Sequence, residues 1–572
     1  MLRTMRVAPF PAVILAILLS GAAAPCQAGG AAAPNSPGEL AARILGESGV
    51  RGGLVVHLGC GKGTLTAALA VGGRYTVHGL DGDPDDVADA RAHIHSLGLY
   101  GKVSVDRFQG GRLPYADNLV NLAVVDAIDG VAVEEVERVL APRGVAMLRE
   151  GDRWRKIVKP RPGEIGEWTH FLHDAGGNAV ADDHVVGPPE RMQWEAGPRW
   201  CRSHEFPSSV NAAVTAGGRL FCILDEGPIG VYEKLPQKCS LVARDAANGL
   251  LLWRQPMRLW GYEYGTGLGT RWNIHHTLPR RLVAGGDRVY VTLSFQGSPV
   301  SVLDAATGEI LVEAIPGTEG ADEMLLDGGI LVVKITDESP GATGSITRSD
   351  LGGSLAAVDA ESGKLLWRKE GAAVAPYALA LREGRLVYHD LAELVCLEAA
   401  SGRPLWRVDL DAERIPGAGT TLVLAGNVVL HHSYRREPRP GSKKGIPVAK
   451  LTALAAEDGR ERWTAKGEIG LAGACTQPTD LFVAGGLVWC GGAREGRDLV
   501  TGEVKHTLEL GQLISPGHHY RCYRSKATEE FLIWPKRGAE FVDLDGNRHM
   551  RHDWLRAPCF TGMLPEIGRA HV

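Results

Sequence analysis

The strongest indication of the fold is the segment Val358-Asp359-Ala360-Glu361-Ser362-Gly363-Lys364-Leu365-Leu366-Trp367-Arg368. Copies of it recur along the C-terminal two-thirds of the chain. A short apolar strand runs into Asp-Ala-x-x-Gly, and a second strand carries a tryptophan. Aspartate and glycine together make a tight turn, in which glycine supplies the positive φ. The segment therefore predicts two antiparallel strands and a large apolar wedge that fills the gap to a neighbouring repeat.

The number and spacing of the copies predict a β-propeller. Most copies follow a second turn of the Gly-Gly or Glu-Gly type, so each unit of about 40 to 60 residues holds about four strands, which is typical of a β-propeller. The turns lie at 245–249, 304–308, 359–363, 398–402, 455–459, 499–502 and 543–546. The tryptophans that follow four of them are Trp253, Trp367, Trp406 and Trp463. We expect an all-β propeller of seven to eight four-stranded blades over residues 191–565.

The pattern Asp-Ala-x-x-Gly-x-x-x-Trp resembles the repeat of the PQQ-dependent alcohol dehydrogenases and of the propeller lipoprotein that assists outer-membrane assembly. The resemblance covers about residues 193–565, and both relatives usually have eight blades. It implies a quinoprotein oxidoreductase as one alternative function. Quinoproteins need a calcium ion beneath the quinone, and most have a disulfide between adjacent cysteines. The chain has no Cys-Cys pair, and no calcium ligand set can be aligned, so we do not expect PQQ.

Residues from about 38 to 150 alternate apolar strands with helical stretches, which predicts a Rossmann-like α/β domain. Leu54–Leu58 is a continuous apolar strand, and the glycine-rich loop Gly59–Gly63 follows it. The next strand begins at Tyr75 and ends at Asp81, and a helix opens at Asp83 with Pro84 in its first position. We expect a parallel, doubly wound sheet over residues 38–158, with the loop at the carboxyl end of its first strand.

The loop pattern His57-x-Gly59-x-Gly61-x-Gly63 resembles motif I of the class I methyltransferases, in which an acidic residue opens the loop. Residues 113–118 and 138–144 match two further stretches of that family. The resemblance implies that S-adenosylmethionine binds at the loop. Its backbone would approach the ligand, and Asp81 would accept hydrogen bonds from the ribose hydroxyls. The candidate cofactor-binding residues are Gly59, Cys60, Gly61, Gly63 and Asp81. A dinucleotide site of the Gly-x-Gly-x-x-Gly type would require glycine at Thr64.

Three departures from the methyltransferase pattern bear on activity. His57 stands where the family carries Asp or Glu, and Gly110 or Gly111 falls where an acidic residue often contacts the adenine amino group. Asn121 replaces the aspartate common before the fourth strand. Two hypotheses therefore stay open, a non-catalytic domain and an active S-adenosylmethionine-dependent methyltransferase. The sequence assigns no catalytic residue.

Residues 159–190 read as a connector with some structure of its own, bounded by segments rich in proline and glycine. His170, His173 and Asp174 have side chains that can bind a metal. We favour the interpretation that they pack the connector on the propeller, and we assign no metal site. His275-His276 and His518-His519 are interpreted as solvated polar residues, and the ten dispersed cysteines as mostly buried free thiols.

The two ends of the chain carry further signals. Arg3 and Arg6 precede an apolar run at 13–19 and small residues at 21–28, which predicts a signal peptide over residues 1–28 and an exported, periplasmic or cell-envelope protein. The chain of 572 residues has a net charge of −5, without the basic excess of a nucleic-acid binder, so we expect no nucleic-acid partner. Beyond the signal segment no stretch reaches membrane-spanning length, so we expect no further membrane span. A protein or glycan partner is expected on the propeller.

Residues 566–572 show no strand pattern, and Ile-Gly-Arg-Ala-His-Val matches what a common sequencing adapter encodes. Because a final propeller blade needs roughly 40 residues, we expect the chain to be an incomplete copy with a non-native tail. The alternative is a natural polar tail that closes a seven-bladed ring.

Overall fold

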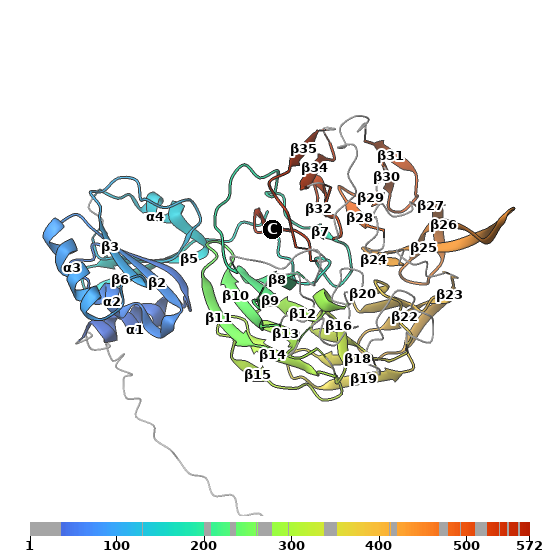
Figure 1. The fold of residues 1–572 in the computed structure, drawn as a ribbon, viewed down its shortest axis with the longest axis horizontal. Coiled ribbons are helices and arrows are strands. Elements are labelled where there is room, and N and C mark those ends of the chain that lie inside the picture. Colours follow the sequence, from blue (N-terminus) through green and yellow to red (C-terminus); the bar gives the residue numbers. More distant parts are fainter. Residues whose placement is uncertain are drawn as a thin grey trace, which may run out of the picture.

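The structure is a computed structural model in which an N-terminal α/β domain lies beside a ring of β-sheets (Figure 1). It describes residues 36–127, 130–198, 208–228, 236–258, 260, 277–295, 297–336, 352–410, 412, 420–467, 479–491, 494–508, 523–536, 538–545, 548–558 and 561–571. The expected signal peptide and the pairs His275-His276 and His518-His519 lie outside these residues.

The N-terminal domain is the doubly wound sheet that the sequence predicts. Its strands follow the order β3-β2-β1-β4-β5-β6, and only the β5–β6 pair is antiparallel. The strands are β1 Gly53–Leu58, β2 Tyr75–Asp81, β3 Val103–Arg107, β4 Val120–Val125, β5 Leu140–Glu150 and β6 Arg153–Val158. The helices are α1 Pro37–Ser48, α2 Thr64–Ala68, η1 Val71–Gly73, α3 Pro84–Ser96 and α4 Val133–Val139.

Helices cover both faces of this sheet because successive strand residues point to opposite sides. Val55 packs in a buried cluster with side chains of α1, α2 and α3, whereas Val56 packs in a second cluster with Val136 of α4. Helix α3 begins where expected, since the Asp83 side chain accepts a hydrogen bond from the Asp85 N–H at 2.8 Å. The loop after β1 lies at the carboxyl edge of the sheet, because β1 pairs in parallel with both β2 and β4.

The described residues beyond 208 form seven blades of four antiparallel strands, as predicted, and the seventh blade carries β7 as an additional strand. The innermost strands β8, β12, β16, β20, β24, β28 and β32 lie side by side around the centre of the ring (Figure 1). The strands are β8 Val210–Ala216, β9 Arg219–Asp225, β10 Cys239–Asp245, β11 Leu251–Pro256, β12 Leu282–Gly285, β13 Arg288–Thr292, β14 Val300–Asp304, β15 Ile310–Val312, β16 Ala321–Asp327, β17 Ile330–Ile335, β18 Ser354–Asp359, β19 Leu365–Glu370, β20 Leu379–Arg382, β21 Arg385–His389, β22 Glu393–Glu398, β23 Pro404–Asp409, β24 Thr421–Ala425, β25 Val428–Arg439, β26 Ser442–Ala455, β27 Glu461–Lys466, β28 Leu481–Ala484, β29 Leu487–Cys490, β30 Glu495–Asp498, β31 Val504–Thr507, β32 Lys526–Thr528, β33 Phe531–Trp534, β34 Ala539–Asp543 and β35 His549–His552. A short helix, η3 Leu278–Arg280, precedes β12.

The repeat tryptophans join neighbouring blades. Trp253 of the first blade donates its indole N–H to Ala305 O of the second blade at 3.0 Å, and its ring lies against Gly308. A Cβ added at Gly308 would be 2.6 Å from that ring, so the turn needs glycine for space as well as for its φ of 73°. Trp367, Trp406 and Trp463 make the same contacts with Gly402, Gly459 and Gly502. The predicted inter-blade position is confirmed.

A hairpin occupies the place between the seventh and first blades. It comprises β36 Leu564–Glu566 and β37 Arg569–His571, in a segment whose sequence shows no strand pattern. Leu564 and Ile567 are buried there, and Glu566 accepts a hydrogen bond from Thr215 of β8 at 2.7 Å. The ring centroids of Trp194 and His571 lie 5.4 Å apart. Trp194 donates its indole N–H to Ala246 O in the turn of the first blade at 3.1 Å, just as each repeat tryptophan donates to the turn of the blade that follows it.

The connector crosses the centre of the ring, where residues 166–183 form what we call the axial plug. One backbone N–H from each of the seven innermost strands donates to the plug, in chain order and at 2.7 to 3.1 Å. The donor–acceptor pairs are Thr215 to Trp168 O, Ala284 to Thr169 O, Leu326 to His170 Nε2, Leu381 to Ala175 O, Leu424 to Gly176 O, Val483 to Asn178 Oδ1 and Ala527 to Ala179 O. The plug thus satisfies donors of strands that would otherwise be open edges.

The two ends of the plug meet at Asp183, whose side chain is fully buried. Its carboxylate accepts hydrogen bonds from the N–H groups of Gly166 and Val186, and from Gly568 in the β36–β37 hairpin. Between these ends, β7 Val180–Ala181 pairs in parallel with β32. The plug is therefore an integral part of the propeller.

Candidate ligand site at the glycine loop

The three loop glycines have positive φ values but serve different purposes. A Cβ on Gly59 would lie 2.9 Å from Ala127 N, and one on Gly63 would lie 2.8 Å from the Ala90 Cβ, so both glycines are needed for packing. A Cβ on Gly61, whose φ is 49°, would meet no atom within 4 Å. Gly61 is therefore the point of the loop where a ligand can approach the backbone most closely.

Asp81 closes the loop from the end of β2. One carboxylate oxygen accepts the N–H of Gly61 at 2.7 Å, and the other accepts the N–H of Asp83 at 3.0 Å. Each carboxylate oxygen has a second lone pair, so a half-buried Asp81 can still accept hydroxyl groups of a sugar. The structure brings the predicted residues together, and contact with S-adenosylmethionine stays a prediction.

Cys60 can contribute only its backbone. Its side chain is 5% exposed, and burial, followed by the charge of Asp81, raises the pKa of the thiol to about 12. A thiol with so high a pKa is not a nucleophile near neutral pH. Cys222 and Cys396 are likewise buried free thiols, and Cys239 and Cys490 are buried as well, in agreement with the interpretation of the cysteines as mostly buried.

His57 lies beneath the loop with both ring nitrogens within hydrogen-bonding distance of other side chains. Its ring is 1% exposed, its Nδ1 lies 2.8 Å from Thr66 Oγ1, and its Nε2 lies 2.9 Å from a carboxylate oxygen of Asp126. The other oxygen of Asp126 accepts a hydrogen bond from Arg149 at 2.9 Å. Burial opposes ionisation of Asp126, but the hydrogen bonds and charges of His57 and Arg149 keep its pKa below the usual range.

Sequence reasoning missed Thr66, Asp126 and Arg149 as the partners of His57. They are separated from it by between nine and more than ninety residues, and only the parallel pairing of β1 with β4 brings Asp126 beside it. The polar side chains beneath the loop therefore bind one another. Of the predicted site residues that the structure describes, Asp81 and the backbone at Gly61 are best placed to contact a ligand.

Asn121 has a role that the sequence did not reveal. Its amide N–H donates to a carboxylate oxygen of Asp245 in the first blade at 2.7 Å, and its Oδ1 accepts from Asn248 at 2.8 Å and from the Leu54 N–H at 2.8 Å. An aspartate here would face the Asp245 carboxylate. This departure from the methyltransferase pattern therefore holds the α/β domain against the propeller, at the sheet edge opposite the glycine loop.

Gly110 and Gly111, at the expected adenine position, offer no side chain to a ligand. Gly110 and Gly111 both have a φ of 86°, and the Gly111 N–H donates to Gly130 O at 2.9 Å. The stretches 113–118 and 138–144 are joined by Arg138, which donates to the carbonyl of Tyr115 and to the carboxylate of Asp117. In this structure the two stretches stabilise each other within the α/β domain.

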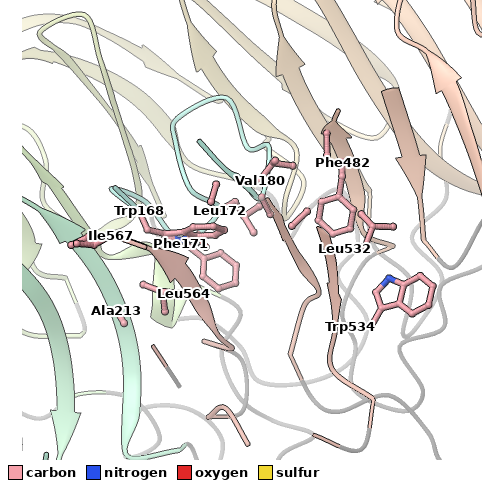
Figure 2. Close-up of a cluster of buried hydrophobic side chains, with 14 of the residues drawn as sticks. Trp168, Phe171, Leu172, Val180, Ala213, Phe482, Leu532, Trp534, Leu564 and Ile567 are labelled. Atoms are coloured by element: carbon pink, nitrogen blue, oxygen red, sulfur yellow. Dashed lines mark hydrogen bonds between the residues drawn. The ribbon is translucent and has the colours of Figure 1, made fainter. Parts of the chain in front are cut away.

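The polar residues of the connector pack the plug, as we favoured. His170 is buried, its Nε2 accepts the Leu326 N–H, and burial, aided by His173, lowers its pKa to about 3. Asp174 forms an ion pair with Arg382 at 3.1 Å. The described residues contain no group of three or more His, Cys, Asp or Glu side chains placed to hold a metal ion. In Figure 2, Trp168, Phe171 and Leu172 of the plug lie among buried side chains of the ring.

Beside the plug lies a small cavity of about 30 Å³, lined by Phe171, Arg280, Glu323 and Tyr377 among others. Arg280 forms an ion pair with Glu323 and lies 3.9 Å from the centre of the Tyr377 ring. The cavity has room for roughly one or two water molecules. The glycine loop is thus the better candidate for a ligand site.

Comparison with known proteins agrees with the two-part architecture. Residues 55–144 match a family model described as methyltransferase domain, and residues 351–509 match one described as outer membrane protein assembly factor BamB. The chain therefore carries a methyltransferase-type domain followed by a PQQ-like propeller. An uncharacterized protein of Haemophilus influenzae is 28% identical over 104 residues, which cover 17% of this chain and 41% of that relative's length.

Similar solved structures are distant. The computationally designed Ika8 protein is 14% identical with a TM-score of 0.42, covering 64% of this chain and 96% of its own. A europium-containing methanol dehydrogenase is 10% identical with a TM-score of 0.38, covering 68% and 85%. A SAM-dependent methyltransferase from Aquifex aeolicus is 23% identical with a TM-score of 0.18, covering 20% and 67%. Among the described helices, none has the length and apolar character needed to cross a membrane.

Proposed function

We propose that this chain is an exported binding protein in which the propeller is a rigid scaffold for a protein or glycan partner. Its methyltransferase-type domain holds the nucleoside end of an S-adenosylmethionine-type ligand and does not transfer the methyl group. The observation that carries this proposal is the closed His57–Asp126 pair beneath the glycine loop. In the family that the domain resembles, an acidic residue stands at the position of His57.

Two features support a nucleoside ligand. Asp81 is at the end of β2, where its carboxylate can accept two ribose hydroxyls, and the backbone at Gly61 faces open space. By contrast, both nitrogens of the buried His57 ring have partners already, so the ring has no donor or acceptor left for a ligand, and Asp126 is held by that ring and by Arg149. Polar groups that are satisfied inside the protein give little net gain to a ligand, so the remaining part of the ligand is held weakly.

Titration calorimetry with S-adenosylmethionine, S-adenosylhomocysteine and adenosine tests this proposal. We expect all three to bind with dissociation constants within about tenfold of one another, and no methyl transfer to accompany binding. Asp81→Ala should weaken all three, because a charge-assisted hydrogen bond is worth about 1.5 to 3 kcal/mol. Glu47→Ala, at the exposed end of α1 where the carboxylate pairs with Arg43, is the control and should leave binding unchanged.

Each other outcome has a definite meaning. S-adenosylmethionine binding more than a hundredfold tighter than adenosine would favour the active methyltransferase. Unchanged affinity in Asp81→Ala would rule out the ribose contact, and absence of binding by the parent protein would leave a scaffold without a ligand in this domain. Calcium-dependent quinone absorbance in the purified protein would instead favour the oxidoreductase.

A further inference from the structure

The hairpin of β25 and β26 extends well beyond its blade. β24 pairs with β25 only at Val428–His432, and β27 pairs with β26 only at Lys450–Leu454. Between these limits, residues 433–449 pair only within the β25–β26 hairpin, from Ser433 opposite Lys450 as far as Arg439 opposite Ser442. We call this segment the arm. It projects from the side of the ring (Figure 1, orange) over about 20 Å, at roughly 3.3 Å per residue.

The arm carries a charge opposite to that of the rest of the chain. Its basic residues are Arg435, Arg436, Arg439, Lys443 and Lys444, and Glu437 is its only acidic residue. The complete chain has a net charge of −5, so the remainder is more acidic still. Because like charges repel, concentrating five basic residues on a two-stranded ribbon does not stabilise the fold.

The root of the arm is firmly held. Tyr434 is 1% exposed, its hydroxyl is hydrogen-bonded to Thr479 Oγ1, and its ring meets His432 edge-on at 5.0 Å. The opposite position on β26 is Ala449, which is also buried. The arm therefore presents its charges from a fixed base.

The composition of the arm excludes several kinds of partner. Pro438, Pro440 and Pro447 have no N–H groups, so the edges are poor templates for an added β-strand. Ile446, at 37% exposed, is the one large exposed hydrophobic side chain among those described in the arm, too little for insertion into a bilayer. The arm has no tyrosine, tryptophan or phenylalanine beyond buried Tyr434 on which nucleic-acid bases could stack.

Basic side chains lie on both faces of the ribbon, since the neighbours Arg435 and Arg436 point to opposite sides. A flat protein surface or a bilayer covers one face at a time, whereas a flexible linear polyanion can contact both. We propose that the arm binds a linear acidic glycan. This inference deepens the binding role proposed for the propeller, and it depends on that role but not on the ligand of the α/β domain.

Fluorescence anisotropy of the full chain with labelled oligogalacturonate, a linear glycan with one carboxylate per sugar, tests the inference. The triple variant Arg435→Glu/Arg436→Glu/Arg439→Glu should bind at least tenfold more weakly than the parent protein. The matched control Arg403→Glu/Arg407→Glu/Arg551→Glu changes the same charge at exposed sites elsewhere on the ring and should stay within about threefold of the parent. A second variant replaces residues 435–448 by Asn-Gly, a favoured two-residue hairpin turn, and should also lose binding while keeping the thermal midpoint of the parent.

Several results would overturn the inference. They are no binding by the parent at physiological salt, equal binding by the arm variants, or an oligonucleotide or anionic lipid vesicle that competes as well as the glycan at equal charge. Adenosine binding, measured on the same variants, should be unchanged in every case. A failure of the glycan inference is thereby distinguished from a failure of the ligand proposed for the α/β domain.

Discussion

Asn121 is one of the residues that couple the two domains, since its amide donates to Asp245 and accepts from Asn248. We predict that Asn121→Asp loosens the domain junction. Two carboxylates would then face each other at a site where burial already raises the pKa of Asp245, at a cost of about 2 kcal/mol. Small-angle X-ray scattering should show a larger radius of gyration, and the apparent stability should fall.

The reciprocal change provides the control for this prediction. Adding Asp245→Asn to the Asn121→Asp variant restores one amide and one carboxylate in the opposite order, and should recover the scattering profile of the parent. Identical scattering and stability in the Asn121→Asp single variant would show that this contact does not hold the domains together.

Lys526 is a buried amine whose titration should be visible in stability. Its side chain is 2% exposed, and its Nζ donates to Phe171 O at 3.2 Å and lies near the rings of Trp168 and Phe171. Burial, then the positive charge of Arg524, lowers its pKa to about 7, and Asp480 opposes this shift. Its pKa in the unfolded chain is about 10.4. The folded state therefore binds fewer protons between these pH values, and this group's contribution to the unfolding free energy rises with pH over that range.

We predict that Lys526→Met raises the thermal midpoint relative to the parent protein at pH 6, and that this advantage shrinks as the pH approaches 10. Lys505→Met, at an exposed position, should show no such trend. Differential scanning fluorimetry across this pH range provides the measurement. A difference between variant and parent that stays constant with pH would mean that Lys526 stays protonated in the folded protein over this range.

At the scale of single elements, the inter-blade tryptophans give the sharpest prediction. Trp406→Ala should lower the apparent stability of the propeller by about 3 to 5 kcal/mol, because the ring is 9% exposed and its N–H donates to Ala456 O of the next blade. Trp554 is 57% exposed, and Trp554→Ala should change stability by no more than about 0.5 kcal/mol. Urea unfolding followed by circular dichroism compares the two, and equal losses would contradict the wedge role.

The tryptophan-containing repeats also show which parts of the fold can be predicted from the sequence. A turn is encoded within five consecutive residues, and its copies make the blade count readable. Strands β1 and β2 were predicted almost to the residue, because buried parallel strands are continuous apolar runs. The β36–β37 hairpin was missed, because its strands are three residues long and their burial depends on Asp183 and Thr215, hundreds of residues away.

The candidate site was predictable to the same extent. Glycine spacing and the acidic end of β2 indicated Gly61 and Asp81, which the structure brings into contact, since both follow local strand-and-turn rules. The sequence analysis treated Asn121 only as a departure from the methyltransferase pattern. Its contact with the propeller could not be predicted, because its partners belong to another domain. The His57 network depends on the pairing of β1 with β4, which no local pattern encodes.

At the scale of the whole molecule, the plug makes the covalent order of the domains part of the propeller's stability. Residues 166–183 leave the α/β domain, satisfy one inner-strand donor in every blade, and only then enter the first blade. The linker before the plug, around Pro162, and the segment after it, around Arg191, are both exposed. A cut at either point breaks the chain once, but only the second cut separates the plug from the ring.

We predict that these two cuts have different consequences. A site-specific protease sequence inserted after Pro162 should, once cleaved, leave the thermal midpoint of the propeller within about 2 °C of the uncut protein, since a midpoint moves only a few degrees per kcal/mol in a large domain. The same insertion after Arg191 should lower the midpoint and make it depend on protein concentration. The plug would then be held by non-covalent contacts alone and would be lost by mass action on dilution. Scanning calorimetry at two protein concentrations, before and after cleavage, makes the comparison. Equal midpoints for the two cut proteins at both concentrations would mean that the inner-strand donors are satisfied well enough without the plug.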